Sequence, residues 1–117
     1  MKNKIELGKM GEKLAADFLK KKGYKILETN YRNKIGEIDI IAEFGGAVIF
    51  VEVKTRTDDR MGAPREAVTY YKQHKIRTTA EGYLKSNGLT ESACRFDCVE
   101  VEGTAPNYRI EHIIGDY

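Results

Sequence analysis

The 117-residue sequence predicts an α/β domain in which helices cover both faces of a mixed β-sheet. Three observations support this class: an amphipathic helical pattern near the N-terminus, two alternating strand-like segments around a pair of glycines, and a second helical segment followed by two more strands. The expected order is αβββαββ. Because a chain of this length builds one modest core, we expect residues 1–117 to form a single domain.

The first helix is expected from Asn3 to about Lys22. Asn3 and Glu6 have the spacing of a capping box, and three lysines before Gly23 suit the negative end of a helix dipole. At about 100° per residue, the apolar side chains share one face of this helix. That face comprises Leu7, Leu14, Ala15, Phe18 and Leu19, and the opposite face comprises Lys9, Lys13, Asp17 and Lys20.

Three strands are expected next, over residues 24–31, 37–44 and 47–56, with a loop at 32–35. The second and third strands alternate with period two on either side of Gly45-Gly46, which is a strong signal for a hairpin. One set of alternate positions (Ile38, Ile40, Ile49, Val51, Val53) is apolar, and Ile41, Val48 and Phe50 extend the charged set as apolar residues. A sheet that is apolar on both faces is covered on both faces, so the charges are expected near the edge of a core.

The second helix is expected to begin at Pro64, which suits a first helical turn, and to end near Ser86. Its apolar stripe comprises Val68, Ile76, Thr79, Ala80 and Tyr83. Two final strands are expected over residues 94–101 and 108–114, joined by a turn at 103–107.

The hairpin carries four charges that a strand pattern does not explain. A two-residue turn places Asp39 opposite Glu52 and Glu37 opposite Lys54, with Cβ atoms about 5 Å apart. Two such carboxylates repel each other unless one is protonated or a cation lies between them. Mg²⁺ prefers carboxylate and carbonyl oxygens, so Asp39, Glu52 and the Val53 carbonyl are candidate ligands. The alternative is a solvated sheet face with a Glu37–Lys54 pair.

Several stretches resemble a known family. The pattern D-x12-E-x-K from Asp39 to Lys54 resembles the signature of the PD-(D/E)XK nuclease superfamily, although Ile38 stands where a proline is often found. The stretches G-E-I-D-I-I-A, F-V-E-V-K-T-R, V-T-Y-Y-K-Q-H-K and C-R-F-D resemble the YraN family, which is related to archaeal Holliday-junction resolvases. The resemblance covers nearly the whole chain. It implies a restriction-endonuclease-like fold and Mg²⁺- or Mn²⁺-dependent hydrolysis of DNA, including branched DNA.

The resemblance implies a catalytic set of Glu12, Asp39, Glu52 and Lys54. In this set Asp39 and Glu52 hold the metal with the Val53 carbonyl, Glu12 assists directly or through water, and Lys54 orients or activates the attacking water. Glu12 lies at the edge of the apolar helix face beside small residues, and the alternative is a boundary glutamate that reaches solvent.

Basic residues around these positions are candidates for DNA contacts. Lys72 projects from the middle of the second helix's apolar stripe, where a lysine either contacts phosphate or extends its stem to solvent. The further candidates are Arg32, Arg56 and Arg60, which suit bidentate phosphate binding, and Gln73. Tyr31, Tyr70 and Tyr71 are candidates either for base stacking or for packing. His74 and His112 are interpreted as structural, and Asp97 has no assigned role.

The charge is unevenly distributed, although the net charge is only +2. Residues 1–34 carry ten Lys/Arg against four Asp/Glu, residues 35–53 none against four, residues 54–85 eight against four, and residues 86–117 two against six. An acidic segment between basic ones suits a polyanion held around a cation site, or only solvated surfaces. The alternative function is a nucleic-acid-binding module that has the nuclease-like fold but does not cleave.

The N-terminus has no apolar core of a secretory signal, and the longest apolar run, Ala47–Val51, is too short to span a bilayer. Cys94 and Cys98 lie about 13 Å apart if they share a strand, which is beyond disulfide reach. These features predict a cytoplasmic protein with reduced cysteines and no membrane partner. Likeness to resolvases suggests a homodimer, because a four-way junction offers two symmetric points of cleavage.

Overall fold

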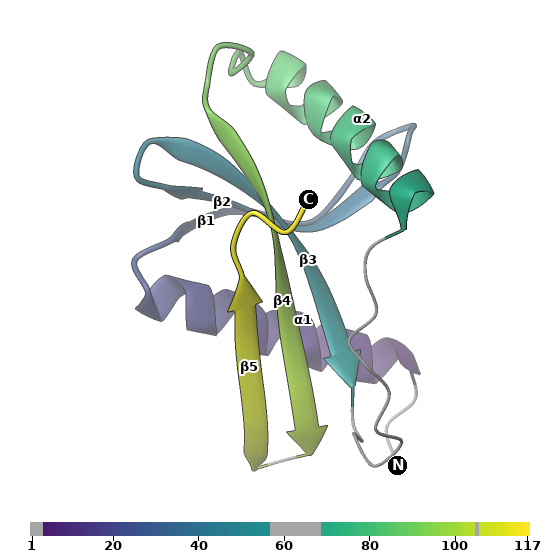
Figure 1. The fold of residues 1–117 in the computed structure, drawn as a ribbon, viewed down its shortest axis with the longest axis vertical. Coiled ribbons are helices and arrows are strands. Elements are labelled where there is room, and N and C mark those ends of the chain that lie inside the picture. Colours follow the sequence, from purple (N-terminus) through teal and green to yellow (C-terminus); the bar gives the residue numbers. More distant parts are fainter. Residues whose placement is uncertain (1–3, 57–68, 105) are drawn as a thin grey trace.

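The computed structural model describes residues 4–56, 69–104 and 106–117, which form two helices and five strands (Figure 1). The elements are α1 (Lys4–Lys21), β1 (Lys25–Arg32), β2 (Glu37–Phe44), β3 (Ala47–Arg56), α2 (Tyr70–Ser86), β4 (Cys94–Thr104) and β5 (Asn107–Ile113). The predicted order αβββαββ and the mixed α/β class are confirmed, and this architecture is compatible with a restriction-endonuclease-like fold.

The five strands form one sheet in the order β1-β2-β3-β4-β5. β3 and β4 are parallel, because α2 provides the crossover between them, and the other neighbours are antiparallel. The hairpin register is as predicted: Phe44 pairs with Ala47 and Ile41 with Phe50. Gly45 and Gly46 have φ values of 59° and 82°, a left-handed conformation that favours glycine.

A helix covers each face of the sheet, with α1 behind the strands and α2 in front of their upper part in Figure 1. The core under α1 includes Ala15, Leu19, Ile40, Val51 and Val99, and the core under α2 includes Ile41, Phe50, Phe96, Ile76 and Tyr83. The predicted apolar faces of both helices are therefore confirmed. Gly11 lets α1 approach β3 closely, because a Cβ there would collide with the Thr55 side chain.

The second helix begins later than predicted. It starts at Tyr70, and Thr69 is an extended N-cap residue whose hydroxyl accepts a hydrogen bond from the Lys72 amide at 3.2 Å. A side-chain oxygen at this position satisfies an amide that has no helical partner, which fixes the start of the helix. Pro64 and Val68 lie outside the described residues, as does the Asn3 half of the predicted capping box.

Two local predictions on β1 and β2 are wrong. Arg32, expected in a loop, is the last residue of β1, where it pairs with Glu37. Ile38, expected on the same face as Ile40, packs in the core under α2. Opposite this part of β2, Asn30 of β1 has a left-handed φ of 54° between the Thr29–Ile40 and Tyr31–Ile38 pairs, so the β1–β2 ladder is not regular at this point.

The charged end of the hairpin opens into a fork. The β2–β3 ladder runs from Phe44–Ala47 to Ile40–Val51, and the predicted Asp39–Glu52 and Glu37–Lys54 pairs lie beyond its end. Instead, the Val53 amide donates a hydrogen bond to Asp39 Oδ2 at 2.8 Å. β3 stays paired with β4 as far as Arg56, so β2 is the strand that departs.

Candidate active site

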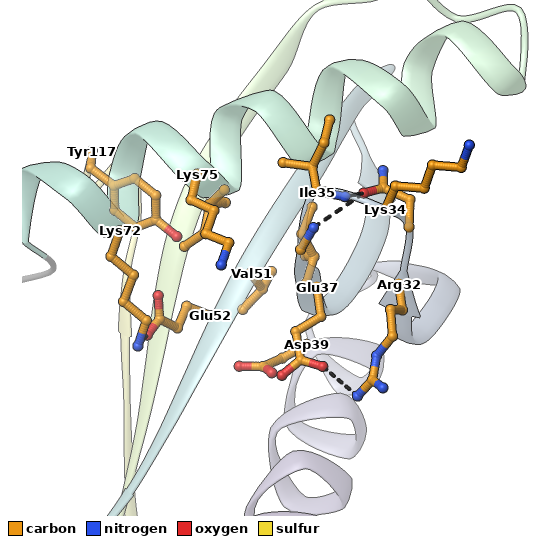
Figure 2. A pocket seen from close by; sticks show the side chains of 14 residues that line it. Arg32, Lys34, Ile35, Glu37, Asp39, Val51, Glu52, Lys72, Lys75 and Tyr117 are labelled. Carbon is orange, nitrogen blue, oxygen red and sulfur yellow. Dashed lines mark hydrogen bonds and ion pairs between the residues drawn. The ribbon is translucent and has the colours of Figure 1, made fainter.

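A pocket of about 420 Å³ lies at this fork, beneath α2 (Figure 2). Its lining combines carboxylates from β2 and β3, cations from β1, the β1–β2 loop and α2, and apolar side chains. These residues are Arg32, Asn33, Lys34, Ile35, Gly36, Glu37, Ile38, Asp39, Val51, Glu52, Lys72, Lys75, Ile76 and Tyr117. The sequence-predicted Asp39, Glu52, Lys72 and Arg32 are thus brought together at one site.

Glu52 is the most deeply buried acid of the pocket, with 7% of its surface exposed. Its Oε1 lies 2.8 Å from the ammonium of Lys72. Its Oε2 is buried and has no hydrogen-bond partner within the described part of the chain. A buried carboxylate oxygen without a partner is costly, which marks this atom as one that suits a ligand.

Asp39 faces the same pocket from β2 and has a perturbed pKa. Burial is the main cause that raises the pKa, the hydrogen bond from Val53 opposes it, and the negative charges of Glu12, Glu52 and Glu37 raise it further, to about 6. Loss of hydration and like charges both disfavour the ionised carboxylate. A cation placed beside Asp39 and Glu52 would relieve both effects.

Lys72 reaches down from the first turn of α2 onto Glu52 (Figure 2). The hydrogen bond to Glu52 raises the pKa of Lys72, so the ammonium stays charged. The lysine that sequence analysis assigned to phosphate is therefore, in the free protein, the counter-ion of a buried acid. More than half of its side chain remains exposed, which leaves it able to change partners.

Glu12 approaches the site from α1, on the other side of the sheet. Burial is the main cause that raises the pKa of Glu12, a hydrogen bond with Asn30 lowers it, and the charge of Glu37 raises it. Glu12 lies close enough to Asp39 to raise its pKa in turn. Asn30, the residue with the left-handed φ, is the link between α1 and the fork that sequence analysis missed.

The remaining predicted residues are placed less centrally. Arg32 forms an ion pair with Glu37 at 2.7 Å on the pocket rim. Lys54 and Arg56 continue β3 past the pocket lining, opposite Glu100 and Glu102 of β4. Gln73 lies on α2 outside the lining, and Arg60 lies outside the described residues.

Within the described ranges, no three His, Cys, Asp or Glu side chains gather into a group that could hold a metal ion. Glu12, Asp39 and Glu52 surround the fork without forming such a cluster as they stand. The Val53 amide contacts Asp39, whereas the proposed role of the Val53 carbonyl stays a prediction.

The pocket lining includes polar residues that sequence analysis did not select, among them Lys75, Asn33 and Tyr117. Lys75 follows Lys72 by three residues, so helical spacing could have indicated it. Asn33 shapes the β1–β2 loop, and the only local sequence feature that indicated a turn there was an asparagine shortly before Gly36. Tyr117 comes from far along the chain, and its buried hydroxyl has no hydrogen-bond partner among the described residues. No sequence pattern places Tyr117 beside Glu52.

Three other predictions, on a histidine, the tyrosines and the cysteines, can be compared with the structure. His112 is buried, its Nε2 lying 2.7 Å from Asp97 Oδ2 and its Nδ1 2.7 Å from Lys22 Nζ, which agrees with a structural role. Tyr31 packs edge-on against Tyr83, whereas Tyr70 and Tyr71 are exposed at the start of α2. Cys94 is exposed and Cys98 is buried, and neither forms a disulfide.

The fold and the pocket together define an α/β protein with a carboxylate-lined site where two strands of a mixed sheet separate. Residues 11–101 match the uncharacterised protein family UPF0102, so the chain belongs to that family, in agreement with the YraN resemblance. The UPF0102 protein of Alkaliphilus oremlandii is 47% identical over 110 residues, covering 92% of this chain and 94% of that protein. That of Caldanaerobacter subterraneus is 52% identical over 99 residues (85% and 81%), and that of Clostridioides difficile 47% identical over 115 residues (98% and 99%).

Neither helix in the described part of the chain is both long and apolar enough to cross a membrane.

Proposed function

We propose that the pocket at the β2–β3 fork is the active site of a Mg²⁺- or Mn²⁺-dependent endonuclease that hydrolyses DNA. The observation that carries the proposal is the unfavourable surroundings of two acids in the pocket, Glu52 and Asp39. Glu52 has a buried oxygen without a partner in the described chain, and the half-buried Asp39 lies near three other carboxylates, those of Glu12, Glu52 and Glu37. Such an arrangement costs folding free energy, and a divalent cation offsets that cost.

The donor set fits a hard cation. Carboxylate oxygens from Asp39 and Glu52, with Glu12 nearby, are the ligands that Mg²⁺ and Mn²⁺ prefer, and these ions keep several waters of their own. When bound, the ion supplies positive charge against the phosphate and makes water a better nucleophile.

The chain's own residues would perform the other tasks. Lys54 follows Glu52 by two residues and so shares its strand face, from which its ammonium can orient the attacking water. Lys72 holds Glu52 in place before metal arrives and is then free to contact phosphate. Lys75 and Arg32 add positive charge at the rim, which favours a polyanion.

A second candidate is a nucleic-acid-binding module without turnover. The observation in its favour is the Lys72–Glu52 ion pair, which already neutralises one of the two proposed metal ligands. Both candidates use the same basic rim, so they differ in cleavage and not in binding.

The test is cleavage of labelled duplex, flap, single-stranded and four-way DNA with Mg²⁺ or Mn²⁺. The wild type should cleave at least one substrate, and Asp39→Asn and Lys54→Ala should both be inactive. Lys54→Ala should still bind metal, because Lys54 is not a ligand. Lys85→Ala, which removes an exposed lysine at the other end of α2, is the matched control and should cleave normally. Binding without cleavage by the wild type would favour the second candidate.

A further inference from the structure

The pocket is bounded on two sides, unlike an open groove along a surface. α2 lies above the carboxylates of Asp39 and Glu52, and the loop of residues 33–36 forms one wall (Figure 2). What this wall is made of, and whether it can move aside, decides which form of DNA can reach the acids.

Asn33 fixes the loop to itself and to α2. The side-chain Oδ1 of Asn33 accepts hydrogen bonds from the backbone amides of Ile35 (2.9 Å) and Gly36 (3.3 Å). The backbone amide of Asn33 donates to the Gly36 carbonyl at 3.0 Å. Its Nδ2 donates to the Thr79 carbonyl of α2 at 3.1 Å. One side chain therefore closes the turn and ties it to the helix.

Two glycines allow this close contact. A Cβ on Gly36 would come within 2.9 Å of Thr79 Oγ1, and a Cβ on Gly82 within 2.7 Å of Asn33 Nδ2. The backbone of the loop at Gly36 therefore packs directly against the Thr79 side chain, and the backbone of α2 at Gly82 packs directly against the Asn33 side chain. The wall is preorganised, and opening it would break the Asn33 hydrogen bonds.

The pocket surface has two kinds of chemistry. Lys72 and Lys75 present ammonium groups from α2, and the Tyr117 hydroxyl is a buried donor without an acceptor in the described chain. Ile35 and Ile76 supply apolar surface, and Ile35 is 44% exposed at the rim. A ligand with acceptor oxygens at one end and a flat, weakly polar group at the other would satisfy both.

We propose that this pocket holds one unpaired nucleotide beside the scissile phosphate, so that the substrate is DNA with single-stranded character at the cut. This inference rests on the proposed nuclease function and narrows its substrate. A volume of about 420 Å³ is within the range of small-molecule sites. A nucleotide turned out of the base stack fits such a site, whereas a base held in a continuous duplex does not enter it.

In this arrangement Tyr117 donates its hydroxyl to a phosphate oxygen, and the base lies against Ile35. Lys72 changes partner from Glu52 to the same phosphate. These roles would explain the missing hydrogen-bond partner of the Tyr117 hydroxyl and the exposure of Ile35.

The experiment measures binding with Asp39→Asn protein, which we expect to fold normally and not to cleave. The probes are a duplex and a matched flap DNA that carry 2-aminopurine at the first unpaired nucleotide of the flap or at the same place in the duplex. We expect about tenfold tighter binding of the flap, with a change in 2-aminopurine fluorescence that the duplex does not show. Ile35→Ala and Tyr117→Phe should each reduce this preference by about threefold or more.

The controls are Ile114→Ala and Tyr108→Phe, matched substitutions outside the pocket lining, which should keep the preference. Equal affinity for flap and duplex, or unchanged 2-aminopurine fluorescence, would overturn the nucleotide site. If the wild type cleaved duplex DNA and the protein bound flap and duplex with equal affinity, the nucleotide site would be overturned but the nuclease function would stand. A flap preference without cleavage of any substrate would support the site and contradict the nuclease.

Discussion

Two aspartates in the same sheet, Asp97 buried and Asp39 half-buried, have opposite electrostatic surroundings. Asp97 on β4 is 0% exposed and accepts hydrogen bonds from Arg95 at 2.9 and 2.8 Å, from the Gly115 amide at 2.9 Å and from His112 at 2.7 Å. Burial alone would raise its pKa, but the hydrogen bonds from His112, Arg95 and Gly115 lower the pKa to about 2. Asp39 on β2 has other carboxylates around it, and its pKa is raised to about 6.

The difference separates a structural acid, Asp97, from Asp39, the acid that we propose as a metal ligand. Because the Lys22 ammonium can only donate, His112 Nδ1 accepts from it and His112 Nε2 donates to Asp97. This chain of contacts ties the end of α1 to β4 and β5, and every oxygen of Asp97 is used. At the fork, by contrast, negative charge accumulates without enough donors, which is the condition that a bound cation removes.

Substitution of Asp97 is expected to have the largest effect on folding stability. Asp97→Ala should lower the free energy of unfolding by about 3–5 kcal/mol, because it leaves Arg95 and His112 without their buried partner. Chemical denaturation at pH 7 measures this. Glu102→Ala, which breaks the more exposed Glu102–Arg109 pair, should cost no more than about 1 kcal/mol. Equal effects of the two substitutions would contradict the assignment of Asp97 as structural.

Asp39→Asn should change folding stability in the opposite direction, so that the variant is more stable than the wild type. The pKa of Asp39 is raised from 3.8 to about 6 on folding, so the folded state binds its proton more tightly. Folding stability should therefore fall as pH rises from about 4 to 6, and the cost is fully present above pH 6. Asn removes that charge and should stabilise the protein by about 1–3 kcal/mol at pH 7.5 without metal.

Urea denaturation across pH 4 to 8 checks this prediction, with Asp17→Asn on the exposed face of α1 as the control. The decline between pH 4 and 6 should be smaller in Asp39→Asn than in the wild type and the control, because only the contribution of Asp39 is removed. If Asp39→Asn were less stable than the wild type at pH 7.5, the unfavourable charge assigned to Asp39 would be wrong.

Lys72→Met should separate the two partners of this lysine. Removing its charge frees Glu52, so the affinity for Mn²⁺ should rise while the affinity for DNA falls. The salt dependence of DNA binding should weaken by the slope of about one phosphate contact. Calorimetry and fluorescence anisotropy measure the two affinities, and Lys85→Met is the matched control. Normal DNA binding by Lys72→Met would show that Lys72 does not contact phosphate and serves only as the counter-ion of Glu52.

Much of the fold could be predicted because its signals are local. Alternation around Gly45-Gly46 gave the hairpin and its register, and helical spacing gave the buried faces of α1 and α2. Lys72 was recognisable because a charge interrupts an apolar stripe. The acids of the site were found for the same reason.

The rest depends on contacts between distant segments. The β2–β3 ladder ends early, at Ile40–Val51, and Asn30 of β1 is left-handed, and no periodic pattern in the sequence indicates either feature. Tyr117 follows β5 in the sequence yet lines the pocket beside Glu52 of β3. The partners of Asp97 are Arg95 on β4, His112 on β5 and the Gly115 amide after β5. Only the folded chain shows which aspartate is fully hydrogen-bonded and which lies among like charges.

The most direct test of the central claim is calorimetric titration of Mn²⁺ into the protein at pH 7.5, without DNA. The wild type should bind, and Asp39→Asn and Glu52→Gln should each weaken binding by about tenfold or more, since each removes one charged ligand. Glu102→Gln, an acid on β4 outside the pocket, should bind as the wild type does. Absence of binding by the wild type, or equal binding by Asp39→Asn, would contradict a metal site at the fork.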